Sequence, residues 1–496
     1  MSAKTQNERI VLGLKVKQLR LAKGYSFADL SQRSGLSISY LNEIEKGKKY
    51  PKSEKLEALV AALETPLTEL TSSELHKSLA PVTQLLESNF LNDLPLDVFG
   101  IDLAKVVEMI AGAPAQVGAF ISTLLEISRN YALREENFYV AALRSYLELH
   151  NNYFEDLEQQ AEQFCVLHHL PAGRPLSPEI LRSVLEKVYG YIIVDDGLDN
   201  YPELKNLRAV YVPARKTLLL NSGLSDTQQV FQFGKELAFN YLKITERAVT
   251  SSLLRGRSFQ EVLNHARATY FSDAILLPAA AFAEDVAEFL ARDKWDGNAF
   301  LSLMKRYAAT PEMFYHRLTN VLPKYFGLEE LFFMRFQHDP VTNRFEVDRE
   351  LHLSRRHQPH SNALSEHYCR RWVSISLLED LHRMQAEGKS VDTMVRAQRS
   401  RFIGVSEEYL SITIARTSYP SPGSNVSVTL GLLFTDALRQ KVRFLNDPAI
   451  QLREVNTTCE RCALSDCTER AAPPVVVEKK RQFQRIHHRL SELDSK

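Results

Sequence analysis

The stretch from Gly24 to Pro51, GYSFADLSQRSGLSISYLNEIEKGKKYP, is the part of the chain that most constrains its fold. Ser26 is placed to cap a short helix, and Gly35 supplies a turn before Ser37, which can cap a second helix. The expected buried positions are Phe27, Ala28 and Leu30 in the first helix and Ile38, Leu41 and Ile44 in the second. The spacing therefore predicts two short helices joined by a glycine turn.

The second of these helices carries polar side chains on the side opposite its apolar positions. Short polar groups at the start of an exposed helix suit base edges in the major groove of DNA, and lysines suit phosphates. Residues 1–70 hold twelve Lys and Arg against eight Asp and Glu, whereas the whole chain has a formal net charge of zero. Positive charge is thus concentrated where double-stranded DNA would bind. The residues predicted to contact DNA are Ser37, Ser39, Tyr40, Asn42, Glu43, Lys46, Lys48 and Lys49.

Two further apolar patterns flank this pair of helices. The preceding helix has Ile10, Leu14, Leu19 and Leu21 as apolar positions and Lys15, Lys17, Arg20 and Lys23 on its polar side. The following helix runs through Leu56, Leu59, Val60 and Leu63. Any three-helix packing unit can show such a pattern. However, the run from Leu30 to Pro51, with Gly35 at the turn and Ile44-Glu45-Lys46-Gly47 near its end, resembles the Cro/cI-type helix-turn-helix family, which implies a DNA-binding domain.

Length and composition limit the remaining architecture. A chain of 496 residues is too long for one hydrophobic core, and 44% hydrophobic with 25% charged residues is typical of soluble globular domains. The polar start, MSAKTQNERI, has no signal-peptide pattern, and no apolar run is long enough to cross a bilayer. Five cysteines are too few for a disulfide framework. We therefore expect a cytoplasmic protein with no membrane partner.

The segment 72–170 reads as helices with few strand signals, and PAGRPLSP at Pro171 to Pro178 reads as a linker. Such a helical region packs as a bundle or forms a dimer interface. Half-sites one helical turn apart on DNA need two copies of the reading helix. We therefore expect a homodimer.

Strand and helix signals alternate after this linker. Tyr189–Asp195 (YGYIIVD) and Leu207–Leu220 (LRAVYVPARKTLLL) predict strands, the second as a hairpin around Pro213, and Asp226–Ile244 predicts a helix. This order, together with ATYFSDAILLP at Ala268–Pro278, resembles the ImmA/IrrE family. In that family a zinc peptidase helix carrying H-E-x-x-H follows such strands.

The corresponding positions on this helix do not carry the zinc ligands. Lys235 and Phe239 stand where the two histidines belong, so Glu236 has no zinc-bound water to activate. We therefore predict a zincin-like scaffold without catalytic residues, in which Glu236 is exposed or ion-paired. Peptide cleavage would require His265 or Asp273 to be recruited.

Three cysteines fall within nine residues near the end of the chain, in TTCERCALSDCTERAAPP, and a fourth lies upstream in HYCRRW. The C-x-x-C step aims two thiolates at one centre, and the other two thiols can complete a set of four. The predicted metal ligands are Cys369, Cys459, Cys462 and Cys467. Zinc and an iron-sulfur cluster suit four thiolates equally, and buried thiols beside an unrelated loop are the alternative. His367 is expected to be a polar neighbour and Cys165 a core thiol.

Nearly the whole chain resembles the short-chain fatty-acyl transcriptional regulator family. The resemblance rests on the Cro/cI-type start, the ImmA/IrrE-like middle and the ending C-x-x-C-x-x-x-x-C-x-x-R-A-x-P-P, matched from Cys459 to Pro474. Cys369 and Trp372 match an upstream Cys-x-x-Trp. The resemblance implies a short-chain acyl-CoA or related metabolite as effector, and some members of the family hold a four-iron four-sulfur cluster on such cysteines.

The last segment predicts a small α/β domain. Tyr409–Tyr419 and Val426–Phe434 read as paired strands joined by SPGSN. Arg416 is placed to pair with a carboxylate or phosphate, or else to be a solvated strand arginine. No glycine-rich phosphate loop of Walker or dinucleotide type occurs, so nucleotide hydrolysis and hydride transfer have no support. The ending, EKKRQFQRIHHRL, predicts a basic helix with a solvated face.

These signals predict a multidomain protein, mainly α with α+β parts. The expected domains are a helix-turn-helix bundle at 1–71, a helical linker or dimerisation region at 72–170, a degenerate zincin-like α/β domain at 171–345, and an α/β effector-sensing domain with the cysteine cluster at 346–496. We expect a non-enzymatic, sequence-specific transcriptional regulator that responds to a metabolite. The alternatives are a metallopeptidase-type regulator that cleaves a partner repressor, and a redox or iron sensor.

Overall fold

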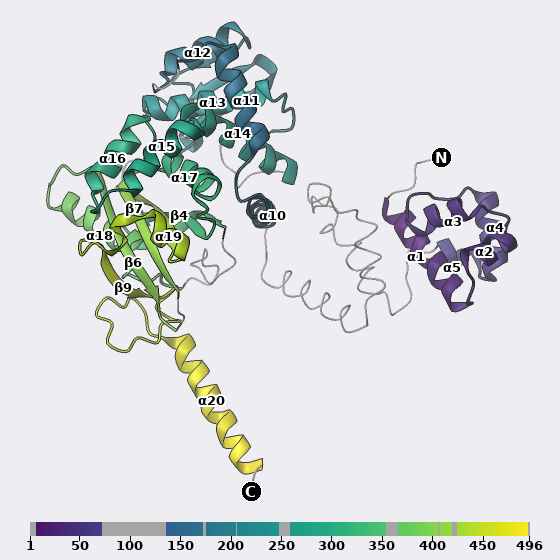
Figure 1. Ribbon diagram of the computed structural model, residues 1–496. Coiled ribbons are helices and arrows are strands. Elements are labelled where there is room, and N and C mark those ends of the chain that lie inside the picture. Colours follow the sequence, from purple (N-terminus) through teal and green to yellow (C-terminus); the bar gives the residue numbers. More distant parts are fainter. Residues whose placement is uncertain are drawn as a thin grey trace. The chain divides into compact units, whose positions relative to one another are not determined.

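The fold was obtained as a computed structural model (Figure 1). The structure describes residues 6–71, 135–171, 175–204, 206–247, 258–353, 366–404, 407–418 and 424–494. Residues 72–134, which were expected to be helical and to contribute a dimer interface, lie outside this part of the chain. The chain divides into two compact units, one made of Met1–Ala142 and Arg257–Gln260 and the other of Leu143–Gly256 and Glu261–Lys496.

The first unit has a helical bundle at its N-terminal end. Its helices are α1 (Gln6–Ala22), α2 (Phe27–Ser34), α3 (Ile38–Glu45), α4 (Ser53–Leu63) and α5 (Leu67–Thr71). They enclose a core of Leu12, Val16, Leu30, Leu41, Ile44, Leu56, Leu59, Ala62, Leu63 and Leu70. Helix α1 approaches α3 so closely at Gly13 that a Cβ there would lie 2.4 Å from the carbonyl oxygen of Ile44. A glycine is therefore needed where these two helices meet.

The second unit contains a small sheet flanked by helices. Its early elements are α10 (Glu135–Leu149, whose first residues belong to the first unit), α11 (Glu155–Leu167), α12 (Pro178–Lys187), β1 (Ile192–Val194), β2 (Ala209–Val212) and β3 (Thr217–Leu220). The strand order is β1-β3-β2, and β2 and β3 are antiparallel. A short 3-10 turn, Pro213–Arg215, joins them, which confirms the predicted hairpin.

Five helices follow this sheet. They are α13 (Asp226–Tyr241), α14 (Phe259–Leu276), α15 (Ala279–Leu290), α16 (Gly297–Arg306) and α17 (Pro311–Phe326). The start of α13 has a capping box in which Ser225 and Gln228 bond each other's backbone, as its predicted position requires. Helix α17 is held to α11 by a buried ion pair between Arg317 and Glu158, with two N–O distances of 2.6 and 2.8 Å.

A six-stranded sheet forms the rest of the second unit, with strand order β5-β4-β8-β7-β6-β9. Its strands are β4 (Leu331–Asp339), β5 (Arg344–His352), β6 (Thr393–Phe402), β7 (Glu408–Thr417), β8 (Asn425–Leu433) and β9 (Gln451–Val455). The other helices are α18 (Val373–Ala386), α19 (Asp436–Lys441) and α20 (Val475–Asp494). Helix α18 packs on one face of the sheet and α17 on the other (Figure 1).

Strands β7 and β8 pair antiparallel in register, as predicted for this hairpin. The sequence did not predict β4, β5, β6 or β9. The domain boundary expected between residues 345 and 346 falls inside β5, which pairs with β4 in the same sheet. The fold is thus multidomain and mainly α with α+β parts, as expected, but the last sheet draws strands from both sides of that boundary. No helix in the described ranges is long and apolar enough to cross a membrane.

Candidate functional site: a DNA-reading helix and a four-cysteine pocket

The caps of α2 and α3 set the geometry of the predicted DNA-reading helix. The Ser26 hydroxyl accepts from the Asp29 backbone N–H at 3.2 Å, and the Asp29 carboxylate accepts from the Ser26 N–H at 2.8 Å. Gly35 ends α2 with φ of 69°, a conformation that favours glycine. The Ser37 hydroxyl then accepts from the Tyr40 N–H at 3.3 Å and starts α3. The predicted caps and turn are therefore confirmed.

The predicted DNA contacts lie on the solvent side of α3 and just after it. Those that are exposed are Ser37, Ser39, Lys46, Lys48 and Lys49, and those that are half-buried are Tyr40, Asn42 and Glu43. Lys49 Nζ lies 2.7 Å from a Glu43 carboxylate oxygen, and this hydrogen bond raises the pKa of Lys49. Lys55 Nζ lies 4.1 Å from the centre of the Tyr40 ring. Tyr40 and Glu43 thus already have cationic partners within the protein.

Two apolar residues expected in the bundle core lie at its surface instead. The Ile38 side chain is 50% exposed between Ser37 and Ser39, and Ala28 is also exposed. Each lies in the first turn of a short helix, where none of the described helices of the bundle covers it. Because an exposed apolar side chain can contact the methyl group of thymine, Ile38 joins the candidate DNA contacts. Helical spacing alone could not identify it, since Ile38 shares a face with Leu41 and Ile44.

Helix α1 also differs from the sequence expectation. Leu21, expected in the core, is 58% exposed, whereas Arg20 and Lys15, expected on the polar side, are only 7% and 8% exposed. The Arg20 guanidinium donates to both carboxylate oxygens of Glu45 at 2.6 and 2.9 Å, and the Lys15 ammonium donates to the backbone carbonyl of Glu69 at 2.7 Å. Long cationic side chains thus reach across the bundle to buried acceptors.

The middle domain carries the residues predicted to replace a zinc site. Helix α13 buries both Lys235 and Glu236. Both Glu236 oxygens accept from Arg247, at 2.7 and 2.8 Å, and one also accepts from the Tyr191 hydroxyl at 3.0 Å. The Arg247 guanidinium lies 3.9 Å from the centre of the Phe239 ring. Glu236 is therefore ion-paired, in agreement with the prediction, and its oxygens are engaged.

Neither of the residues considered for recruitment completes a metal site here. The Lys235 Nζ lies 3.0 Å from His265 Nε2, and burial lowers the pKa of Lys235 to about 7. Burial and the Lys235 charge also lower the pKa of His265. Asp273 is bonded instead to His316, at 2.5 Å. The arrangement is that of a packed polar cluster, and Lys235 has taken a position from which a cation would be repelled.

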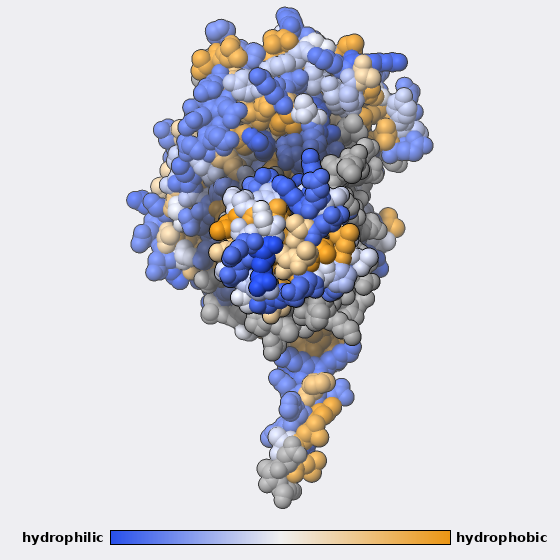
Figure 2. Space-filling model, turned by 90° about the vertical axis from the view of Figure 1, so that its right-hand side faces the viewer, coloured by the Kyte–Doolittle hydropathy of each residue, from blue (hydrophilic) through white to orange (hydrophobic). Residues whose placement is uncertain are grey.

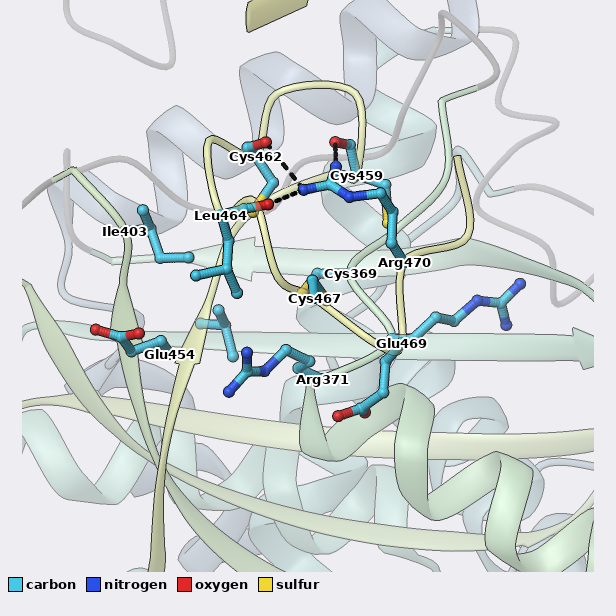
Figure 3. A pocket seen from close by; sticks show the side chains of 12 residues that line it. Cys369, Arg371, Ile403, Glu454, Cys459, Cys462, Leu464, Cys467, Glu469 and Arg470 are labelled. Atoms are coloured by element: carbon cyan, nitrogen blue, oxygen red, sulfur yellow. Dashed lines mark hydrogen bonds between the residues drawn. The ribbon is translucent and has the colours of Figure 1, made fainter. Parts of the chain in front are cut away.

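The four predicted metal ligands come together at one pocket. It is lined by Cys369, Cys459, Cys462 and Cys467, and by Arg470, Glu469 and other residues of the same loops (Figure 3). Cys369 precedes α18, whereas the other three lie between β9 and α20. Tyr368 and Thr458 form an isolated β-bridge that joins these two segments. Residues about 90 positions apart are thereby brought to one place.

Hydrogen bonds from the flanking residues fix the loops around this pocket. The Cys459 N–H donates to the His367 carbonyl at 2.8 Å, and Arg461 donates twice to Glu366 at 2.8 Å. Arg470 donates to the carbonyl oxygens of Cys459, Cys462 and Leu464 (Figure 3). The sequence offered no signal that Arg461 and Glu366 would pair. His367 points away to Glu460, with 2.8 Å between Nδ1 and Oε1, as a polar neighbour would.

The donor set of this pocket fits a thiolate-ligated metal centre. The Ala471 N–H lies 3.3 Å from Cys459 Sγ, the kind of bond that stabilises a thiolate. Burial, together with the neighbouring Cys459 and Cys462, raises the pKa of Cys369 to about 11. In the described ranges, no three Cys, His, Asp or Glu side chains are arranged closely enough to hold one metal ion. The cysteines therefore share a pocket without forming a closed ligand set. Cys165 lies elsewhere, half-buried against the main core.

Comparison with known proteins agrees with this domain organisation. Residues 16–70 match the helix-turn-helix family, and residues 200–319 match the family described as IrrE N-terminal-like domain. The first match covers α2 and α3, and the second covers α13 and most of α17. Both resemblances stated from the sequence are thereby confirmed.

Several transcriptional regulators are similar to this chain. The HTH-type transcriptional regulator RamB of Mycobacterium tuberculosis is 24% identical over 93% of this chain and 94% of its own length. The propionyl-CoA carboxylase regulator of Cereibacter sphaeroides is 21% identical over 94% of this chain and 95% of its own length. A solved structure titled Mycobacterium tuberculosis transcriptional regulator has 20% identity and a TM-score of 0.46, covering 66% of this chain and 92% of that chain.

Proposed function

We infer that this chain, a DNA-binding transcriptional regulator by its helix-turn-helix domain and its relatives, binds operator DNA through α3 and responds to a metabolite through its second unit. The observation that carries the DNA-binding part is the capped α3 with exposed polar residues at its start and three lysines directly after it. Such a helix reads bases with its first residues while lysines contact phosphates.

A short-chain acyl-CoA or a related compound is the effector class we propose. The support is the similarity, over nearly the whole chain, to a protein whose name ties it to propionyl-CoA carboxylase. An effector biases two arrangements of a regulator only as far as its affinities for them differ. We also propose that the protein acts in the cytoplasm as a homodimer, because paired half-sites need paired reading helices.

The test is to sequence the DNA that the full-length protein retains from its own genome, with and without acyl-CoAs. The proposal expects a few enriched sites that share a two-fold symmetric sequence, and an acyl-CoA that changes their occupancy. Retention of DNA without any shared sequence would contradict sequence-specific regulation. Enriched sites that no acyl-CoA affects would contradict the effector class and leave the DNA-binding part standing.

We propose no peptidase activity. A zincin needs two imidazoles on one helix face and a carboxylate free to activate water. Lys235 and Phe239 occupy the imidazole positions, and Arg247 holds both oxygens of Glu236. Zinc-dependent loss of a candidate repressor in the presence of the purified protein would overturn this proposal and restore the metallopeptidase alternative.

For the cysteine pocket we propose an iron-sulfur cluster held by Cys369, Cys459, Cys462 and Cys467, with zinc as the alternative. When bound, such a cluster supplies electron exchange or sensitivity to oxygen, whereas zinc supplies structure only. The surrounding chain orients the thiols through Arg470 and donates the Ala471 N–H to sulfur. Binding would displace the proton of the Cys369 thiol, whose pKa burial raises to about 11.

Anaerobic purification of the protein distinguishes an iron-sulfur cluster from a zinc ion. A brown protein with broad visible absorbance supports the cluster, whereas a colourless protein with one zinc per chain supports the structural alternative. Cys462→Ser should abolish either signal, and Cys165→Ser, at a cysteine outside the pocket, should leave it unchanged. Anaerobically purified protein that contains neither iron nor zinc would contradict the metal site.

A further inference from the structure

A second cluster of charged side chains lies in the second unit, on the face of the six-stranded sheet covered by α17. Strand β4 contributes Arg335, β5 contributes Arg349 directly opposite it, and β7 contributes Arg416. Arg208 precedes β2 and interacts electrostatically with the same group. The acidic centre of this arginine cluster is Glu312, at the start of α17.

Glu312 is bonded by only two of the four arginines. Arg416 donates to both of its carboxylate oxygens, at 3.0 and 2.9 Å, and Arg335 donates to one of them at 3.2 Å. Arg335 also pairs with Asp348. Arg416 keeps a buried Nε without any acceptor. Among the described residues, the guanidinium groups of Arg208 and Arg349 make no hydrogen bond or ion pair, although Glu312 attracts both.

Positive charge therefore exceeds negative charge inside this part of the molecule. Four guanidinium groups, those of Arg208, Arg335, Arg349 and Arg416, stand against the two carboxylates of Glu312 and Asp348. Like charges placed directly opposite each other in a sheet, as Arg335 and Arg349 are, are destabilising. Burial lowers the pKa of Arg335 to about 10, with Glu312 opposing the shift and the like-charged Arg349, Arg208 and Arg416 adding to it. A surplus of buried charge is costly unless a counter-charge compensates it.

One of these arginines is accessible to a small solute. Arg349 on β5 is exposed to solvent. Arg208 is half-buried. Each guanidinium offers up to five N–H donors in a planar fork, the geometry that suits the oxygens of a phosphate.

We propose that the cluster formed by Arg208, Arg335, Arg349 and Arg416 binds a phosphate group of a small anion. A group of charge near −2 balances the surplus of two positive charges and supplies acceptors to the donors that Arg208 and Arg349 leave unused. Glu312 holds Arg335 and Arg416 in place for it. The proposal of an anion-binding site does not depend on the proposed function. Because acyl-CoAs carry phosphates, this site could be the effector site, and that identification rests on the proposed regulatory function.

The test measures binding to the full-length protein by calorimetry and by the shift in thermal unfolding. The probes are inorganic phosphate, coenzyme A and propionate. The variants are Arg349→Gln in the cluster and Arg383→Gln, an exposed arginine on α18 whose side chain is 67% exposed. Both variants lose one positive charge, so a general effect of net charge would appear equally in both.

We expect phosphate and coenzyme A to bind and to raise the unfolding temperature. Arg349→Gln should weaken the affinity for each of these two anions by at least tenfold, whereas Arg383→Gln should leave both affinities unchanged. Without added anion, Arg349→Gln should unfold at the same or a higher temperature, because it removes an uncompensated charge. Equal binding to both variants, or binding of propionate alone, would overturn the proposal. Without effector, Arg349→Gln should bind operator DNA as tightly as the unsubstituted protein does. If neither of these two proteins binds operator DNA, that result counts against the proposed function and not against the anion site.

Discussion

At the scale of single residues, the largest departures from expectation are charged groups that the structure buries. Arg20 on α1 and Lys235 on α13 are both almost inaccessible to solvent. A charged side chain is buried only where a partner is present or where its charge can be lost. The two residues illustrate these two cases.

Arg20 is the case with a partner, since its guanidinium donates two hydrogen bonds to Glu45 and a third to the Tyr25 carbonyl. Arg20→Met should leave a buried carboxylate unpaired and destabilise the N-terminal bundle by about 3 kcal/mol. Urea unfolding followed by circular dichroism measures this loss. The double variant Arg20→Met, Glu45→Met should recover most of it, because no charge then remains buried. A double variant as unstable as the single one would show that packing, and not charge, is responsible.

Lys235 is the case in which charge can be lost, since burial lowers its pKa to about 7. In the unfolded chain its pKa is about 10.4, so between these values the unfolded state binds a proton that the folded state lacks. Stability should therefore rise with pH across this window. Lys235→Met should remove that rise and be more stable than the unsubstituted protein at pH 7, with the difference shrinking toward pH 10.

Urea unfolding at several pH values between 7 and 10 measures this difference. Lys305→Met, at an exposed lysine of α16, is the matched control and should keep the pH dependence of the unsubstituted protein. Parallel pH profiles for Lys235→Met and the unsubstituted protein would mean that Lys235 does not titrate differently on folding.

At the scale of elements, the sequence predicted well those with strong local signals. Capped helices such as α2, α3 and α13, and the hairpins β2–β3 and β7–β8, were placed to within a few residues. Strand β4 was missed because it begins with the short apolar run LFFM, which does not distinguish a strand from a buried helix. Strand β6 was missed because its three arginines obscure the alternating pattern.

The reading helix α3 gives a prediction that separates its two kinds of contact. Lys49→Ala should weaken binding to operator and unrelated DNA alike and make the salt dependence shallower by about 0.9 in log–log slope, because one phosphate contact is lost. Asn42→Ala should cost about 1–3 kcal/mol at the operator and little at unrelated DNA. Fluorescence anisotropy at several salt concentrations measures both effects. If neither substitution changes operator affinity, α3 is not the reading helix.

Helix α20 is exposed along nearly all of its length, as expected for a solvated basic helix, but apolar side chains are among those exposed. Its exposed apolar residues include Phe483, Ile486, Leu490 and Leu493, at 73%, 51%, 54% and 68% exposure. Figure 2 shows apolar residues gathered along one edge of this helix, at the lower end of the view. Their spacing of three and four residues is that of a coiled-coil seam. The proposed homodimer could therefore use α20 as one of its contacts.

The corresponding prediction is that Leu490→Glu lowers the dimer fraction at micromolar concentration, because it places a charge within the seam. Gln484→Glu, which adds the same charge outside the seam, should leave the dimer unchanged. Light scattering coupled to gel filtration measures the mass of each variant. A dimer that tolerates Leu490→Glu would exclude α20 from the interface.

At the scale of the whole molecule, DNA and effector would bind to different compact units of one chain. If an effector changes operator affinity by a given factor, the operator must change effector affinity by the same factor. We therefore predict equal factors when coenzyme A thioester binding is measured by calorimetry with and without saturating operator. Operator binding that responds to the effector without this reciprocal change would show that a further state or partner is involved.

The sequence by itself determined the features that depend on neighbours along the chain. Helix caps, the glycine turn, the missing zinc ligands and the spacing of Cys459, Cys462 and Cys467 all belong to this class, because each is fixed by contacts within a few residues. Burial also follows from periodicity where a whole helix face packs against the core, as with Leu41 and Ile44.

Only the tertiary structure decided which distant groups meet. It brought Cys369 to the other cysteines, paired Arg20 with Glu45, and exposed Ile38 at the start of the reading helix. It also gathered arginines from separate strands around Glu312. No local pattern contains this information, because the face of an element that becomes buried, and the charge it then meets, depend on elements that pack against it from elsewhere in the chain.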